Sequence, residues 1–303
     1  MFHRTVYGSL STLVVVVLGA SAIQCSSSSR DGYEAPHAPD AEPQQQLISP
    51  VDAAAEANVA DGIDQECTGE NTQIYVLTRF PSAIYRFDPA SLTFALVGQL
   101  DCPTGKRSTF SMAIDRRGNA WVLFSGGMVV NVRLSDLQCK EVVLNNRPAD
   151  LASYGMGFSK DDSSAGESLF LHDYALNMGL FRVDLSTRDV SRVGLTSVGA
   201  AELTGTGDGK LFGYYSSNGV IARFDKTTGA SLETYRTSAV GKGSWAFSQW
   251  GGDFWIYLGE SGTTSSVHRY SPATDETTIA IEDTGLDIVG AGSSTCAPFK
   301  PVQ

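Results

Sequence analysis

Few residues of this chain have the types and the spacing that enzyme chemistry requires. Asp283, Thr284 and Gly285 could supply one carboxylate to a proton-sharing aspartate pair, but that chemistry needs two such triplets and the sequence contains one. Residues 205–210, Gly-Thr-Gly-Asp-Gly-Lys, are glycine-rich like a phosphate-binding loop, yet Leu211 stands where such a loop has Ser or Thr. Both segments are therefore interpreted as turns.

Histidine, the usual general base and metal ligand, is scarce. His3 and His37 precede the expected folded domain, which leaves His172 and His268 within it. Two histidines cannot form a three-histidine zinc site, and a Ser-His-Asp triad would have to use one of them. We expect His172 in an exposed loop, where a surface role without chemistry is favoured.

A cluster of aromatic residues lies between positions 245 and 255. It contains Trp245, Phe247, Trp250, Phe254 and Trp255. Phe247 and Trp255 are expected in the core, because large flat side chains bury much apolar area. Trp250 is expected in a turn, from which it could stack on a sugar ring, although packing is the favoured interpretation.

The elements that must position these residues recur five times. Each repeat has an aromatic or apolar residue, a short strand and then a turn that begins with Asp or Ser, at positions 88, 135, 184, 225 and 271. A period in the forties with short strands is typical of a β-propeller, whose blades are four-stranded antiparallel meanders. The sequence therefore predicts an all-β fold, a five-bladed β-propeller.

Each expected blade has the same internal pattern. The second strand carries an aromatic residue in constant register, at positions 75, 121, 170, 212 and 255. We expect each of these rings to pack between neighbouring blades. The innermost strand has small residues beside large ones, as crowding near the axis requires, and Asp in the outer turn can accept hydrogen bonds from its own backbone amides.

The repeat does not begin cleanly, which predicts how the ring closes. Three strands precede the innermost strand of the second repeat, and residues 287–292 form an unaccompanied strand at the end of the chain. We expect this strand to complete the first blade, because closure removes exposed sheet edges. It would bring Cys296 close to Cys67, so a disulfide is predicted between them.

The remaining cysteines of the domain are Cys102 and Cys139. Their pairing is predicted from parity alone, since an exported domain rarely leaves thiols unpaired. The expected geometry is awkward, because Cys102 follows the end of one outer strand and Cys139 lies near the start of the next. An ordinary outer strand could put them too far apart to bridge.

Residues 1–24 are predicted to be an export signal of the lipoprotein type. The apolar run 13–23 is about half as long as a membrane-spanning helix. Cys25 follows it directly and is expected to receive the lipid, although Gln24 departs from the small residue usual at that position. Ala20-Ser21-Ala22 instead resembles an ordinary cleavage site, so a soluble periplasmic or extracellular protein is the alternative.

Residues 25–66 are rich in Ser, Pro, Ala and Gln and have no periodic apolar pattern. Such a segment cannot bury enough surface to offset the entropy of ordering, so we expect a disordered tether. The propeller domain is predicted over residues 67–300. A domain of this length can bury a substantial core.

Several segments of the domain resemble one known group of proteins. They are residues 100–103, 111–115, 201–209 and 288–298. These segments are similar to those of uncharacterised secreted β-propeller lipoproteins of myxobacterial type, and the resemblance covers most of residues 67–298. It implies the fold and a place in the cell envelope, and it implies no activity.

The acidic balance of the chain bears on its partners. The formal net charge is −11, which repels phosphate backbones, so no nucleic acid is expected. Residues 225–229 resemble the turn of quinoprotein repeats but occur once in full, so no cofactor is expected. We expect a monomer whose partners are the membrane, through the lipid anchor, and a protein or glycan.

Function is expected in the irregular loops on one face, because loops carry function while the scaffold stays rigid. The candidate residues share that position: Arg107, Arg147, Tyr154, His172, Tyr174, Glu202, Lys242 and Glu260. Two hypotheses remain open. The first is a lipid-tethered, non-catalytic binding or scaffold module for a protein, peptide or glycan; the alternative is a propeller hydrolase or lactonase with a metal at the axial channel.

Overall fold

The computed structural model describes residue 67 and the ranges 69–175, 177–197, 199–241, 243–260 and 263–302. The chain divides into two units, residues 1–48 and 49–303, and every described residue belongs to the second. The predicted signal 1–24, Cys25 and the predicted tether 25–66 lie outside the described residues. Within the described ranges, no helix has the length and apolar character needed to cross a membrane.

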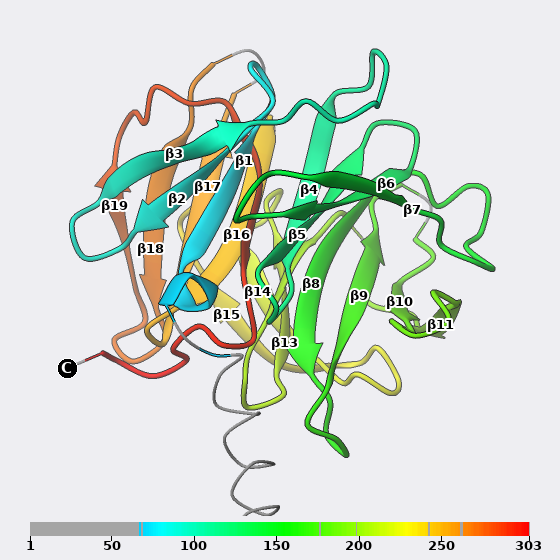
Figure 1. Ribbon diagram of the computed structural model, residues 1–303. Helices are drawn as coiled ribbons and strands as arrows, with labels where there is room; N and C mark the ends of the chain where they lie inside the picture. Colours follow the sequence, from blue (N-terminus) through cyan, green and yellow to red (C-terminus); the bar gives the residue numbers. More distant parts are fainter. Residues whose placement is uncertain are drawn as a thin grey trace, which may run out of the picture. The chain divides into compact units, whose positions relative to one another are not determined.

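In the described part of the chain, twenty strands form five four-stranded antiparallel sheets, which are the blades of a propeller (Figure 1). After a short 3-10 helix, η1 (Gly69–Thr72), blade 1 contains β1 (Ile74–Thr78), β2 (Ala83–Asp88), β3 (Thr93–Gln99) and the C-terminal β20 (Ile288–Ser293). Blade 2 contains β4 (Thr109–Ile114), β5 (Asn119–Phe124), β6 (Met128–Arg133) and β7 (Cys139–Val142). Blade 3 contains β8 (Tyr154–Lys160), β9 (Glu167–Asp173), β10 (Leu180–Val183) and β11 (Val190–Gly194). Blade 4 contains β12 (Glu202–Gly205), β13 (Leu211–Tyr215), β14 (Val220–Phe224) and β15 (Ser231–Arg236), and blade 5 contains β16 (Ser244–Trp250), β17 (Asp253–Gly259), β18 (Ser266–Ser271) and β19 (Glu276–Ile281).

The five innermost strands surround the axis. Strands β20, β4, β8, β12 and β16 contact one another in this order, and β16 contacts β20 again. The outermost strands, such as β3, β7, β11 and β19, lie at the periphery in Figure 1. The predicted five-bladed β-propeller is confirmed.

The C-terminal strand closes the ring, as predicted. β20 pairs antiparallel with β1, with Ile74 opposite Ser293 and Val76 opposite Ala291. The strand covers Ile288–Ser293, so it begins and ends one residue later than the predicted range 287–292. Blade 1 therefore combines the first and last strands of the domain, and β20 pairs with the edge of β1 that would otherwise be open.

The apolar core is divided among the five interfaces between blades. Each hydrophobic cluster joins residues of two neighbouring blades, and each contains one of the aromatic residues predicted from the repeat: Tyr75, Trp121, Phe170, Phe212 and Trp255. The side chains alternate along a strand, so Tyr75 packs toward blade 2 and its neighbour Ile74 packs toward blade 5. The predicted role of these rings between blades is confirmed.

Glycines permit the close approach of inner strands. A Cβ on Gly155 in β8 would collide with the carbonyl oxygen of Ala201, directly before β12. Gly205 in β12 has the same relation to the carbonyl oxygen of Phe158. The small residues expected near the axis are therefore required where blades 3 and 4 meet.

Both predicted disulfides are present. Cys67 and Cys296 are bonded with a Cα–Cα distance of 4.9 Å, and Cys102 and Cys139 with one of 5.5 Å. Two disulfides in a small domain indicate folding in an oxidising compartment outside the cytoplasm. The Cys102–Cys139 pairing, predicted from parity despite an awkward expected geometry, is confirmed.

The twist of the blades explains how Cys102 reaches Cys139. The right-handed twist accumulates over four strands, so that β3 runs across the periphery of blade 1 toward blade 2 (Figure 1). Leu137, in the turn before β7, packs against Gly98 near the end of β3. The end of one outer strand and the start of the next are therefore neighbours.

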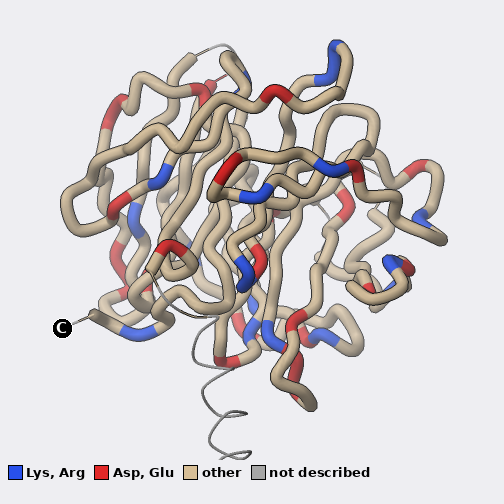
Figure 2. The backbone as a smooth tube through the Cα atoms, viewed as in Figure 1, with Lys and Arg blue, Asp and Glu red and all other residues tan. Residues whose placement is uncertain are grey.

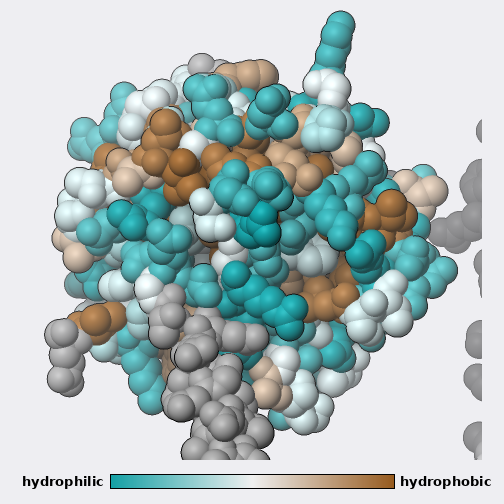
Figure 3. All heavy atoms as spheres, viewed as in Figure 1, coloured by the Kyte–Doolittle hydropathy of each residue, from teal (hydrophilic) through white to brown (hydrophobic). Residues whose placement is uncertain are grey.

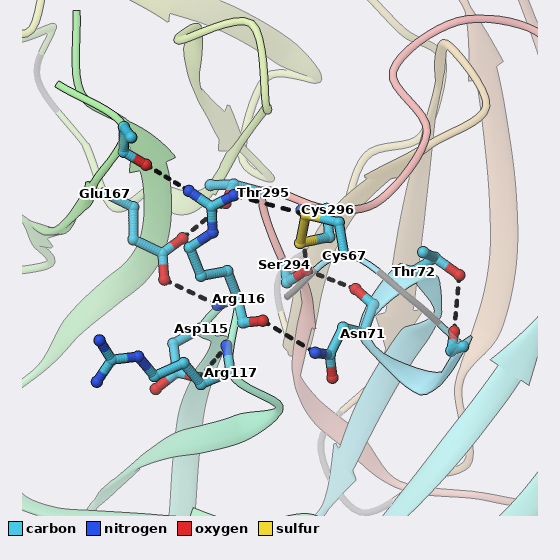
Figure 4. Close-up of a disulfide and its surroundings, with 12 residues drawn as sticks. Cys67, Asn71, Thr72, Asp115, Arg116, Arg117, Glu167, Ser294, Thr295 and Cys296 are labelled. Atoms are coloured by element: carbon cyan, nitrogen blue, oxygen red, sulfur yellow. Dashed lines mark hydrogen bonds between the residues drawn. A yellow bond between two sulfur atoms is a disulfide. The ribbon is translucent and has the colours of Figure 1, made fainter. Parts of the chain in front are cut away.

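The closing disulfide lies beside a buried carboxyl (Figure 4). Arg116 donates a hydrogen bond from Nη2 to Cys67 Sγ at 3.6 Å, and its backbone amide donates to Glu167 Oε1 at 2.8 Å. Thr295, next to Cys296, donates to Glu167 Oε2 at 2.7 Å. Burial raises the pKa of Glu167 to about 7. This network joins blades 1, 2 and 3 on the face that carries the disulfide.

The outer surface of the domain is mixed in character. Figure 2 shows Lys and Arg interspersed with Asp and Glu along the backbone. Figure 3 shows hydrophobic residues in small groups among hydrophilic ones on the side in view. Exposed apolar side chains such as Leu96, Val143 and Ile279 lie on or next to the peripheral strands.

Candidate functional site

A pocket of about 320 Å³ opens on the propeller axis. Its described lining comes from four blades: Arg79 and Val289 (blade 1), Ser108, Thr109 and Phe110 (blade 2), Tyr174 (blade 3), and Gly243, Ser244 and Trp245 (blade 5). Most of these residues lie at the start of an inner strand or in the loop before it. The others, Arg79 and Tyr174, directly follow the second strand of a blade. The pocket therefore lies on the face that the sequence predicted to be functional.

Three aromatic side chains form one wall of the pocket. The rings of Tyr174 and Trp245 are stacked, with centroids 5.3 Å apart and an interplanar angle of 10°. Phe110 meets Tyr174 edge-on at 5.3 Å. Offset stacking and edge-to-face contact are the favoured arrangements of aromatic pairs, so blades 2, 3 and 5 together hold this wall in place.

The loop that carries Tyr174 is held by its own backbone and by one buried aspartate. The amide of Tyr174 donates to Ser153 O at 3.1 Å. Asp173, at the end of β9, accepts a hydrogen bond from the amide of Met178 at 3.0 Å. Blade 3 itself thus sets the backbone position of Tyr174.

A buried carboxyl lies behind the wall. Glu202, the first residue of β12 in blade 4, is 0% exposed. Its Oε1 accepts a hydrogen bond from the Tyr174 hydroxyl at 2.6 Å, and its Oε2 accepts one from Ser111 Oγ at 2.9 Å. Burial raises the pKa of Glu202 to about 8, although the two hydroxyl groups oppose the shift. Glu202 therefore links blade 4 to blades 2 and 3.

Arg79 supplies positive charge at the pocket. It follows β1, and its side chain is 33% exposed. The backbone amide of Arg79 donates to Asp287 O at 3.1 Å, whereas Arg79 Nε lies 3.7 Å from Asp287 Oδ2. The second distance exceeds that of a hydrogen bond, so Asp287 neutralises the guanidinium only loosely.

The structure brings some of the predicted face residues together and separates others. Tyr174 and Glu202 meet at the axis. Arg107 and Arg147 line a different groove of about 440 Å³, at the edge of blade 2. Glu260 is in an exposed loop after β17. Lys242 lies outside the described residues.

The expectation that His172 lies in an exposed loop was wrong. It is in β9, which extends to Asp173 because His172 still pairs with Leu180 of β10, and it is 1% exposed. Its Nε2 lies 2.7 Å from Thr196 Oγ1 and 3.2 Å from the Tyr215 hydroxyl. Burial lowers the pKa of His172 to about 4, so the ring is neutral at physiological pH.

Two further candidates are buried instead of presented on the face. Tyr154 begins β8, is fully buried in the interface between blades 2 and 3, and has a pKa that burial raises above its usual value. Glu202 is equally buried and reaches the site only through Tyr174. Both begin inner strands that pack tightly against their neighbours, which removes them from solvent.

The motifs interpreted as turns are turns. Asp283 Oδ1 accepts a hydrogen bond from the amide of Gly285 at 2.9 Å. Thr206 and Lys210 close the hairpin between β12 and β13, with the Thr206 amide donating to Lys210 O at 3.0 Å. Neither segment contributes to the axial pocket.

The sequence predicted Trp250 in a turn, and this was wrong. Trp250 is the last residue of β16. Its Nε1 donates to Thr72 O at 2.9 Å, and its ring packs against the interface of blades 5 and 1. The favoured packing role is confirmed. The tryptophan that lines the pocket is Trp245, at the other end of the same strand.

Sequence reasoning missed Arg79, Phe110 and Trp245 as site residues. Each stands at the end of a strand that faces the axial loops. The available signal was an aromatic second residue in two inner strands, β4 and β16, and a charged residue directly after β1. Without the arrangement of the blades, nothing in the sequence brings these three together.

Among the residues that the structure describes, no group of three or more His, Cys, Asp or Glu side chains could hold a metal ion.

Comparison with known proteins identifies no family. No protein-family model and no curated protein matches the chain. Among solved structures, it is similar to a streptogramin B lyase, with 16% identity over 70% of this chain and 65% of that chain and a TM-score of 0.41. It is also similar to a chain of a nidogen/laminin complex, with 10% identity over 74% of this chain and 98% of that chain and a TM-score of 0.47.

A third similar structure is TolB from Acinetobacter baumannii, with 21% identity over 77% of this chain and 59% of that chain and a TM-score of 0.43. The chain thus spans less than two thirds of the length of the streptogramin B lyase and TolB chains. At these identities and TM-scores, the similarities say nothing about function.

Proposed function

We propose that this protein is a lipid-tethered β-propeller of the cell envelope that binds a ligand non-catalytically in the axial pocket. The observation that carries the proposal is the pocket itself. Four blades line it, and Glu202 of the remaining blade lies behind its aromatic wall. Binding sites are typically concave, largely apolar and preformed, with a few polar groups that fix orientation.

The side chains at the pocket are suited to holding a ligand rather than to transforming it. Its described lining consists of aromatic, hydroxyl-bearing and small residues, Val289 and Arg79. The carboxyl of Glu202 is shielded by Tyr174, and the ring of His172 is engaged within the core. These groups can stack on a ring, donate hydrogen bonds and attract an anion.

Pocket binding is tested by capture from cell-envelope extracts on the immobilised protein. Trp245→Ala removes half of the stacked pair and should reduce the captured ligand at least about tenfold, since buried aromatic anchors dominate binding energy. Trp250→Phe, on the same strand but away from the pocket, is the matched control and should capture as the wild type does. Circular dichroism verifies that each variant is folded. Equal capture by Trp245→Ala and the wild type would contradict binding in this pocket.

The tether is supported by the pairing of the cysteines. The two disulfides use four of the five cysteines in the sequence, and Cys25 is the fifth. In an oxidising compartment, a lipid on Cys25 accounts for the odd thiol.

Lipidation is tested by the mass of the mature N-terminus. Protein extracted from membranes should begin at Cys25 and carry acyl chains, and Cys25→Ser should release it into the soluble fraction. A single acyl chain gives only weak membrane binding, so more than one chain is expected. An unmodified N-terminus at Ile23 would rule out the lipid anchor.

A further inference from the structure

The size of the axial pocket limits what can occupy it. Its volume of about 320 Å³ is near the lower end of the range for small-molecule sites. Such a pocket accepts one ring with a short substituent more readily than an extended polymer. The occupant is therefore a small molecule or the end of a chain.

The aromatic wall selects for a planar ring. Tyr174 and Trp245 already form a parallel stack, and Phe110 approaches edge-on. A further aromatic ring can add to this arrangement by the same offset or edge-to-face contacts, which contribute beyond the area they bury. A saturated ring would gain burial but not these contacts.

Arg79 selects for a carboxylate. It is the charged residue among the described residues that line the pocket. Its guanidinium presents paired N–H donors that match the two oxygens of a carboxylate. The neighbouring Asp287 has Oδ2 3.7 Å from Arg79 Nε, and its Oδ1 accepts a hydrogen bond from Ser244 Oγ at 3.4 Å. A ligand carboxylate can therefore bind Arg79 without first breaking a close ion pair.

The charge of the whole chain restricts the number of anionic groups. A net charge of −11 repels a polyanion over the length of its approach. A single carboxylate experiences this repulsion least and gains the local attraction of Arg79. The ligand thus combines one negative group with one ring.

Resting on the proposed binding function, we propose that the axial pocket binds an aromatic ring that carries a carboxylate. The ring packs against the wall formed by Trp245, Tyr174 and Phe110, and the carboxylate pairs with Arg79. This chemistry has two sources, a free aromatic acid or the C-terminal aromatic residue of a peptide.

Four probes separate the ring from the charge. Purified protein is titrated with 3-phenylpropionate, 3-phenylpropanol, 3-cyclohexylpropionate and glucuronate, and binding is measured by calorimetry and by tryptophan fluorescence. The aromatic acid should bind at least about tenfold more tightly than each of the other three, because only it combines aromatic contacts with the wall and a carboxylate on Arg79. Equal binding of the neutral alcohol, or tighter binding of glucuronate, would overturn the proposal. Binding of Gly-Gly-Phe with a free C-terminus, compared with that of 3-phenylpropionate, then distinguishes a peptide end from a free acid. The amidated peptide lacks the carboxylate and tests whether the peptide binds through it.

Arg79→Ala should weaken binding of 3-phenylpropionate at least about tenfold and leave that of 3-phenylpropanol unchanged. Arg86→Ala is the matched control, because Arg86 is exposed on the same hairpin and outside the pocket lining. An unaffected Arg79→Ala variant would overturn the assigned role of the guanidinium.

If capture from envelope extracts depends on Trp245 but no aromatic acid binds, the ligand class is wrong and pocket binding stands. If capture does not depend on Trp245, pocket binding itself fails.

Discussion

Replacing Cys67 and Cys296 together by Ser should lower the free energy of unfolding by about 5 kcal/mol. The two residues are 229 positions apart, so the disulfide closes almost the entire domain into one loop. In the chain-entropy account, the loss of such a loop restores much conformational freedom to the unfolded state. The native state loses the covalent link that holds β20 next to the start of blade 1.

The Cys102–Cys139 pair provides the control for this experiment. It closes a loop with a sequence separation of 37, and its removal should cost about 4 kcal/mol. Urea unfolding gives the two free energies, and hydrogen exchange shows where each variant opens. Loss of Cys67–Cys296 should increase exchange in β20 and β1, whereas loss of Cys102–Cys139 should act near β3 and β7. Unchanged exchange in β20 would show that strand pairing alone closes the ring.

The ring and its closure could be predicted because they depend on local, repeated signals. The turn aspartates illustrate this: Asp88 and Asp225 each accept a hydrogen bond from the amide two residues later, at 2.9 and 2.7 Å. Because the pattern occurs in five blades, it can be recognised even where single repeats deviate from it. The first repeat had three strands, so it was the sheet that the unaccompanied C-terminal strand could complete.

The candidate site could not be predicted in the same way. Arg79, Phe110, Tyr174 and Trp245 come from four blades, and each blade contributes one or a few residues to a pocket that no single repeat contains. Their convergence depends on the arrangement of the blades around the axis. His172 was misplaced for a related reason, since its burial comes from the packing of blade 4 against blade 3 and not from its neighbours in the sequence.

The buried carboxyl of Glu202 should make the protein less stable as the pH rises. Its ordinary pKa is 4.5, and burial raises it to about 8 in the folded state. Between these values the folded protein holds a proton that the unfolded chain releases, so the free energy of unfolding falls with increasing pH. The contribution is fully present below about pH 4.5 and is lost by about pH 8. At about 1.4 kcal/mol per pKa unit, the change is on the order of 5 kcal/mol.

Two other buried groups add to the pH profile. Glu167, with a pKa raised to about 7 by burial, acts in the same direction as Glu202. The pKa of His172 is lowered from 6.5 to about 4, so its contribution is present above pH 6.5 and is lost as the pH falls toward 4. Stability should therefore be greatest at mildly acidic pH and decline on both sides.

Glu202→Gln isolates the contribution of this carboxyl. The amide keeps the shape of the side chain, its oxygen can accept from the Tyr174 hydroxyl, and its nitrogen can donate to Ser111 Oγ. The variant should be more stable than the wild type at pH 9, with a shallower decline between pH 5 and 9, when both are unfolded in urea at each pH. Glu233→Gln removes an exposed carboxyl on β15 and should leave the profile of the wild type unchanged. If the free energy of unfolding of Glu202→Gln declines between pH 5 and 9 as steeply as that of the wild type, the proton held by the folded state resides on another group. Glu202 would then be ionised behind the aromatic wall throughout this range.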